Sequence, residues 1–176
     1  MGSHQAQMQG FAKYNREFNA RLFTLVADLS DNERKKDLGA FFCSIHGTLN
    51  HILLADRIWL GRFANAFPAM ASLQTAQLVQ QFASLRDELY ADFSELSTQR
   101  LATDKVITHF ADELTDTQLA STMKYSNSQG QLREHPGWVA IAHMFNHQTH
   151  HRGQLTTLLH QLGHDVGVTD FVAYMV

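Results

Sequence analysis

Apolar residues recur at helical spacing in four long segments of this chain. An α-helix repeats every 3.6 residues, so side chains three and four positions apart share one face. The predicted helices span residues 8–29, 38–66, 75–98 and 136–162, and the third continues at least to Thr98. Four amphipathic helices bury their apolar faces most readily against one another. The pattern therefore predicts an all-α protein, a four-helix bundle.

The segment between the third and fourth predicted helices has a different pattern. Residues 121–133 alternate polar and apolar side chains around the turn-forming run Ser126-Asn127-Ser128-Gln129-Gly130. This predicts a short hairpin or extended excursion before the last helix. No repeat or linker divides the chain, so we expect a single domain over residues 5–176. Residues 1–4, Met-Gly-Ser-His, are typical of a remnant of an expression vector.

Charge and composition exclude several classes of function. The formal net charge is −3, which gives no basic surface for nucleic acid, so no nucleic-acid partner is expected. No apolar run reaches the length of a membrane span, so no membrane partner is expected either. The only cysteine, Cys43, has no internal partner for a disulfide, which favours a reducing compartment and a cytoplasmic protein.

Histidine is unusually frequent, and two histidines have the spacing of metal ligands. The chain has 11 histidines, five of them between His135 and His151. His147 and His151 lie four residues apart in the last predicted helix, a spacing at which two imidazoles share one ion. On a helical wheel with His143 at zero, they fall near ~40° and ~80°, at and inside the apolar stripe. His143 and His150 fall toward the flank, so we expect them at the rim of a site.

His51, on the second predicted helix, is the candidate third ligand. It lies about 120° from the polar residues His46, Asn50 and Arg57 on the helical wheel, and so we expect it to face the protein interior. His46 and Arg57 are expected to share the solvent-exposed face. An inward histidine can equally be a hydrogen-bonded core residue, and the sequence alone does not bring His51 to the pair. Three histidine ligands would leave a coordination position open, as in a reactive metal site. We expect a pocket lined from the first, second and fourth helices, including Thr48, Ala55 and Asn146.

Two segments carry a resemblance to a known family. Residues 44–59, together with residues 146–154, resemble the DinB family of metal-dependent proteins. Positions near both ends of the chain are also similar to that family: Tyr14, Asn15, Asn19, Thr169, Asp170, Phe171 and Tyr174. The resemblance implies an up-down-down-up four-helix bundle that is commonly a homodimer. It also implies a divalent metal ion held by His51, His147 and His151.

The resemblance also suggests a reaction. Relatives with known activities use low-molecular-weight thiols, as bacillithiol-S-transferases and mycothiol-dependent isomerases do. Our leading hypothesis is a thiol-dependent S-transferase acting on a small-molecule substrate, in which a cation stabilises the thiolate that attacks. A metal-dependent hydrolase and a non-catalytic metal-binding or interaction bundle are the alternatives. Zinc or nickel suits three imidazoles best, with iron, cobalt or manganese as alternatives, and no catalytic residue is assigned.

Overall fold

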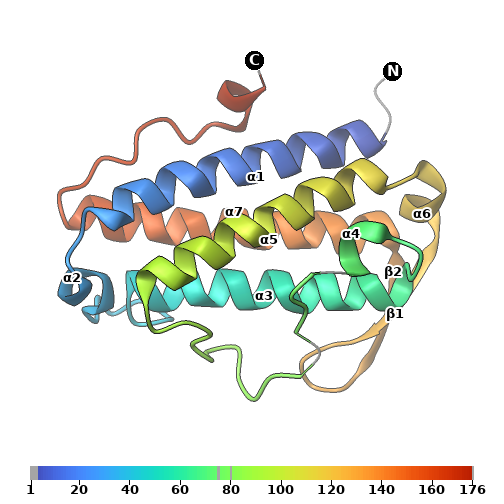
Figure 1. Cartoon of the computed structure of the whole chain (residues 1–176), viewed down its shortest axis with the longest axis horizontal. Helices are drawn as coiled ribbons and strands as arrows, with labels where there is room; N and C mark the ends of the chain where they lie inside the picture. Colours follow the sequence, from blue (N-terminus) through green and yellow to red (C-terminus); the bar gives the residue numbers. More distant parts are fainter. Residues whose placement is uncertain (1–3, 75, 80, 176) are drawn as a thin grey trace.

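The protein is mostly helical, as the sequence predicted. The structure is a computed structural model that describes residues 4–74, 76–79 and 81–175. Its four long helices lie side by side (Figure 1): α1 (His4–Ala27), α3 (Ile45–Ala66), α5 (Phe93–Glu113) and α7 (Gly137–Gln161). Both α1 and α3 pack against α5 and α7. No helix in the described part of the chain is long and apolar enough to cross a membrane.

The four long helices run in two directions. Asp56 of α3 pairs with Arg100 of α5, and further along both helices the Phe63 ring stacks on Phe110. Contacts that advance together along both helices mean that α3 and α5 are parallel. Figure 1 shows α1 and α7 running the opposite way. As a result, α1 packs antiparallel to α5, and α7 packs antiparallel to α3.

Short elements connect and cover the long helices. They are α2 (Asp31–Lys35), α4 (Ala71–Gln74), α6 (Asp116–Ala120), β1 (Thr122–Ser126), β2 (Leu132–Pro136) and the 3-10 helix η1 (Phe171–Tyr174). Strands β1 and β2 form an antiparallel hairpin in which Lys124 faces Glu134. The predicted extended excursion before the last helix is therefore confirmed. At the C-terminal end, η1 lies on α1, where Phe171 contacts Phe11 and Tyr14.

The core has two apolar parts separated by a polar layer. One apolar cluster contains Phe63, Phe110 and Met144, and the other contains Phe18, Leu53 and Leu155. On α3, α5 and α7, buried polar residues fall between the positions that belong to the two clusters, and on α1 they lie on either side of Phe18. We call this set the polar layer; its members are Asn15, Asn19, Asp56, Arg100, Asp104, Gln148 and Arg152. Such residues are rarely buried unless they pair with one another.

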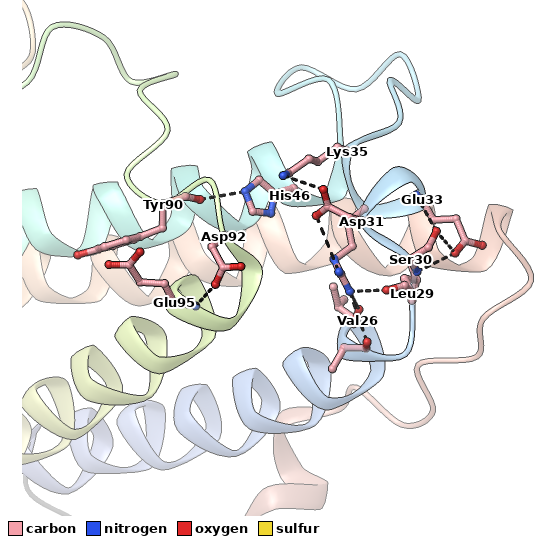
Figure 2. A network of polar contacts seen from close by, with 12 residues as sticks. Val26, Leu29, Ser30, Asp31, Glu33, Lys35, His46, Tyr90, Asp92 and Glu95 are labelled. Atoms are coloured by element: carbon pink, nitrogen blue, oxygen red, sulfur yellow. Dashed lines mark hydrogen bonds and ion pairs between the residues drawn. The ribbon is translucent and has the colours of Figure 1, made fainter.

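The third predicted helix was wrong over most of its length. Thr75, where it was expected to begin, lies outside the described residues. The described residues from 76 to 92 form no helix, and α5 begins only at Phe93 and continues to Glu113. Asp92 caps that start, since its side chain accepts a hydrogen bond from the backbone N–H of Glu95 at 2.8 Å (Figure 2). The apolar residues before Phe93 do not share one face: Leu78 packs against one apolar cluster, Leu89 packs against the other, and Leu85 is exposed.

Hydrogen bonds from α3 hold this irregular segment in place of a helix. Asn50 accepts from the Tyr90 backbone N–H at 3.0 Å and donates to the Tyr90 carbonyl oxygen at 3.1 Å. His46 Nε2 lies 2.9 Å from the same carbonyl (Figure 2), and Arg57 donates to the Tyr90 hydroxyl at 2.7 Å. The predicted exposure of His46 and Arg57 was therefore wrong. The face of α3 that the wheel assigned to solvent is covered by the segment that leads to α5.

The second predicted helix begins seven residues later than expected. Residues 38–44 form a tight loop, and Ser44 caps α3 by accepting from the Gly47 backbone N–H at 3.0 Å. Cys43 has a φ of 64°, in the left-handed region that non-glycine residues rarely adopt. A side chain at position 47 would place its Cβ 2.3 Å from the Phe42 carbonyl oxygen, so only glycine allows this close approach. The loop thereby sets Phe42 beside the first turns of α3.

Candidate metal centre

Three histidines from two helices meet at one point. His147 Nε2 lies 3.2 Å from Nε2 of His51 on α3 and 3.0 Å from Nε2 of His151 on α7. One ring nitrogen from each of the three residues lies within 4.8 Å of the others. The described residues thus bring together the three histidines that the sequence singled out. Their spacing is one at which a single metal ion could be held.

The opposite ring nitrogens of two of these histidines are fixed by acceptors. His51 Nδ1 lies 2.8 Å from the Leu85 carbonyl oxygen, and His151 Nδ1 lies 2.8 Å from Oε1 of Gln154. A carbonyl oxygen accepts only, so Nδ1 carries the hydrogen and Nε2 presents its lone pair. This is the arrangement in which a second shell orients metal-binding histidines. The Nε2 lone pairs of His51 and His151 therefore both face His147 Nε2, which can donate a hydrogen to one of them or join both around a cation.

The environment keeps the three imidazoles neutral. The pKa of His51 is lowered to about 4, mainly by burial and also by the nearby His151, while the hydrogen bond to Leu85 opposes both effects. Burial is also the main reason that the pKa of His147 falls to about 3, with His151 and His51 contributing. The pKa of His151 is lowered by burial too. A neutral imidazole is the form that binds metal, so the ligand atoms are free near pH 7 without losing a proton first.

Phe42 closes one side of the histidine cluster. Its ring stacks on His51, with centroids 3.8 Å apart and an interplanar angle of 16°, and meets the edge of His151 at 5.5 Å. Phe42 itself is buried. An apolar ring at this position excludes water from that side, which strengthens electrostatic interactions within the cluster.

The other side of the cluster opens into a cavity of about 280 Å³, which we call the histidine-side cavity. Both His51 and His147 line it. The remaining wall comes from α3, from His143 of α7, from the segment before α5 and from the β1–β2 hairpin: Ala55, Ile58, Trp59, Arg62, Phe82, Leu85, Tyr125, Asn127 and Ser128. An ion held by the three histidines would therefore border a space large enough for a small molecule.

The expected pocket lining was correct only in part. Ala55 lines the histidine-side cavity, but Thr48 is buried and its hydroxyl donates to the Ser44 carbonyl oxygen at 2.8 Å. Asn146 lines a different cavity, of about 230 Å³, between α1 and α7. No described residue of α1 lines the histidine-side cavity, so the predicted contribution of the first helix was wrong. The hairpin and the segment before α5 take that place.

The two flanking histidines lie outside the cluster. His143 is exposed and lines the histidine-side cavity, with its ring 5.0 Å from Trp59 and 6.1 Å from His147. His150 is exposed, and its Nε2 lies 3.3 Å from Nε2 of Gln154. Both therefore lie at the rim of the site, as the wheel phase predicted.

Sequence reasoning missed several side chains of the site. Trp59 and Arg62 follow His51 by eight and eleven positions, so the same helical wheel could have placed them beside it. Tyr125 and the Leu85 carbonyl oxygen come from the hairpin and the irregular segment. Their approach depends on tertiary contacts, which no local spacing encodes.

Comparisons with known proteins show a family that the whole chain matches. The family model described as "DinB family" matches residues 1–176. A curated relative, "Protein DinB" of Bacillus subtilis (strain 168), is 25% identical over 164 residues, which cover 93% of this chain and 90% of the relative. The similarity thus extends over both helices that carry the three histidines.

Proposed function

Because the chain belongs to the DinB family, we propose that it binds a divalent metal ion through His51, His147 and His151 and acts as a thiol-dependent S-transferase. One observation carries the proposal: three neutral imidazoles converge beside a cavity, and the Nε2 lone pairs of His51 and His151 are directed at Nε2 of His147. Three protein ligands suit a reactive site, since a fourth position stays available to a small molecule.

The donor set supports zinc or nickel as the ion. Imidazole suits first-row divalent metals, and the absence of a cysteine from the cluster removes the softest donor. Iron, cobalt and manganese are alternatives with the same donors. Elemental analysis of protein purified without a nickel column distinguishes among them.

The roles of the protein's own residues follow from the geometry. When bound, a divalent ion supplies positive charge that lowers the pKa of a thiol and favours its thiolate. Leu85 and Gln154 hold His51 and His151 in the tautomer that binds. Phe42 excludes water on one side, and the histidine-side cavity holds the electrophile on the other. In the transfer, the sulfur–carbon bond forms, the leaving group departs with its bonding electrons, and the thiol proton passes to solvent.

A cobalt-substituted protein tests this proposal. Chelator-treated protein is loaded with cobalt and titrated with glutathione, cysteine or 2-mercaptoethanol. We expect a thiolate-to-cobalt charge-transfer band in wild type and none in His151→Ala. Turnover of thiol with an aryl halide should disappear with chelator and return with added metal. Absence of the band for all three thiols contradicts the thiol proposal.

The alternatives predict other outcomes of the same experiment. Metal-dependent release of product from an ester without any thiol would indicate a hydrolase, in which water occupies the open position. Metal binding without turnover of either substrate would indicate a non-catalytic bundle. Partner binding by such a bundle should then survive removal of all three histidines.

Two further proposals concern architecture. We propose that the four long helices form an up-down-down-up four-helix bundle, which the parallel course of α3 and α5 against α1 and α7 supports. We also propose a homodimer, on the basis of the family resemblance. Light scattering measures the mass directly: twice 19.9 kDa supports the dimer, and 19.9 kDa contradicts it.

A further inference from the structure

We infer that the histidine-side cavity binds a small ligand that carries an anionic oxygen group, a carboxylate or a phosphate, and that Arg62 is the residue that holds this group. The inference concerns Arg62 and stands on the shape and charge of the cavity. It rests on the proposed function only where it identifies the ligand as an acidic thiol.

One face of α3 connects the histidine cluster to Arg62. His51, Ala55, Ile58, Trp59 and Arg62 all line the cavity. Their spacing of four, three, one and three places them along one side of the helix. Eleven residues correspond to ~16 Å along a helix axis. The cavity therefore extends from the histidines toward Arg62, and a molecule that reaches both must be elongated.

The guanidinium of Arg62 is held by aromatic rings and by no carboxylate. Its central carbon lies 4.5 Å from the centroid of Trp59 and 5.1 Å from that of Tyr125. These two rings also contact each other, with centroids 5.1 Å apart. Stacking fixes the plane of a guanidinium while leaving its N–H groups free to donate. Within the described part of the chain, no hydrogen bond or ion pair of Arg62 is found.

The buried arginines differ from Arg62, because their guanidinium groups donate hydrogen bonds to side chains. Arg57 donates to Thr103, Tyr90 and Gln99, and Arg100 pairs with two aspartates. Arg152 donates to three polar side chains. Among these arginines, Arg62 alone has no hydrogen-bond acceptor among the described residues, although it is half-buried. Burial lowers the pKa of Arg62, which means that its charge is less favourable here than in water.

The described lining around Arg62 contains no carboxylate, and the nearby Lys124 is paired with Glu134 at 3.3 Å. A second cavity, also of about 280 Å³, shares Arg62 and Tyr125 with the first and includes Lys124. Neither Asp nor Glu is among the described residues that line the two cavities. Low-dielectric walls with one sign of charge attract a ligand of the opposite sign. A planar guanidinium with free parallel N–H groups matches a carboxylate or a phosphate in a bidentate pair.

The length and charge of the cavity together define the ligand class. One end presents nitrogen lone pairs for an ion and the other presents a free guanidinium, with Ile58 and Phe82 between them. An elongated small molecule with an apolar middle and an acidic end fits these features. With the proposed function, the acidic end belongs to the thiol that binds at the ion or to its reaction partner.

Isothermal calorimetry with matched thiols tests the inference. The probes are 6-mercaptohexanoate, 6-mercaptohexyl phosphate and 6-mercaptohexanol, which differ only in the terminal group. On zinc-loaded wild type, we expect at least one acid to bind about 10- to 100-fold more tightly than the alcohol, the usual effect of a charge-assisted hydrogen bond. The better acid identifies the group as carboxylate or phosphate. Arg62→Met should abolish this advantage, Arg62→Lys should keep part of it, and Arg133→Met, on the exposed strand β2, should keep all of it.

A second set of probes separates this inference from the proposed function. The S-methyl thioethers of the two acids cannot become thiolates, so their binding to metal-free protein reports Arg62 alone. Weaker binding of these thioethers to Arg62→Met, at unchanged thermal stability, supports the inference even if no thiol binds the metal. Equal binding of the acids and the alcohol to wild type overturns it, as does equal binding of the acids to wild type and Arg62→Met. Thermal unfolding of each variant shows whether the protein is folded.

Discussion

The histidine cluster and the polar layer are both groups of polar side chains buried in a helical core, but they differ in what their atoms face. In the polar layer, Arg100 lies between Asp56 and Asp104, at 2.5 Å and 2.8 Å, and opposite charges face one another. In the histidine cluster, ring nitrogens of three neutral imidazoles face one another. The first arrangement contains its own counter-charges. The second contains no charge, and its nitrogens are of the kind that hold a cation.

The two groups also differ in whether their residues border a cavity. Asp56, Arg100 and Asp104 are at most 2% exposed, and none of them lines the histidine-side cavity. His51 and His147 form part of its wall. Burial and polarity alone therefore do not indicate a functional site. Metal-ligand nitrogens that converge beside a cavity are a better indication, because an ion held by them would border open space.

Removal of Arg100 should have the largest effect on stability. Arg100→Met leaves two buried carboxylates without their counter-charge, and breaking a buried ion pair in this way costs about 3–5 kcal/mol. Urea unfolding followed by circular dichroism measures the change. Arg16→Met is the matched control, because Arg16 forms an exposed pair with Glu17 whose loss should change stability by at most about 1 kcal/mol. Similar effects of the two substitutions would contradict a structural role for the polar layer.

Removal of His151 should affect metal binding more than folding. His151→Ala deletes a direct donor, so we expect its loss of metal affinity to exceed the roughly 10- to 100-fold typical of second-shell changes. Competition with a chromophoric chelator measures the affinity. The apolar clusters stabilise the fold independently, at about 1.5–3 kcal/mol per fully buried side chain, so the helical spectrum should persist. Unfolding of wild type by chelator alone would instead show that the ion is structural.

Removal of Gln154 should have a smaller effect on the same affinity. Its Oε1 fixes the His151 ring at Nδ1, so Gln154→Ala should weaken metal binding by about 10- to 100-fold while keeping the stoichiometry. Gln161→Ala, at an exposed position at the end of the same helix, is the control and should leave the affinity unchanged. An unchanged affinity in Gln154→Ala would mean that His151 is oriented by packing alone.

The smallest expected effect is a pH dependence that arises in the polar layer. Burial raises the pKa of Asp56 from 3.8 to about 6, although Arg100 opposes the shift. Between these values the folded protein binds the proton more often than the unfolded chain does, so the contribution of Asp56 to stability falls as pH rises from about 4 to about 6. The difference in unfolding free energy between wild type and Asp56→Asn should decrease by on the order of 1 kcal/mol over this window. A difference that increases with pH would show that attraction to Arg100 outweighs burial.

The sequence predicted the parts of the molecule that depend on local periodicity. The spacing of His147 and His151 identified the pair, and the wheel phase of His51 made it the candidate third ligand, because each helix carries its own phase in its sequence. The resemblance to the DinB family joined His51 to the pair. The same reasoning assigned residues 75–92 to a helix, where Leu78, Phe82, Leu85 and Leu89 have helical spacing. Hydrogen bonds from Asn50, His46 and Arg57 hold an irregular path there instead.

That irregular path also explains why the cavity could not be predicted. The Leu85 carbonyl oxygen reaches His51, and Phe82 reaches the cavity, only because the segment before α5 crosses the face of α3. Tyr125 reaches Trp59 through the hairpin. Asp92 with Glu95 three residues later was a local signal for the start of α5. The contacts that shape the cavity are tertiary, and they depend on atoms distant in the sequence.

Anomalous X-ray diffraction from crystals of the zinc-loaded protein tests the central claim most directly, because it locates the ion and its ligands together. We predict one ion bound by Nε2 of His51, His147 and His151 at about 2.0–2.2 Å. The remaining position should hold water or an anion that faces the histidine-side cavity. An ion bound by two or fewer of these histidines, or one closed off by a fourth protein side chain, would contradict the account.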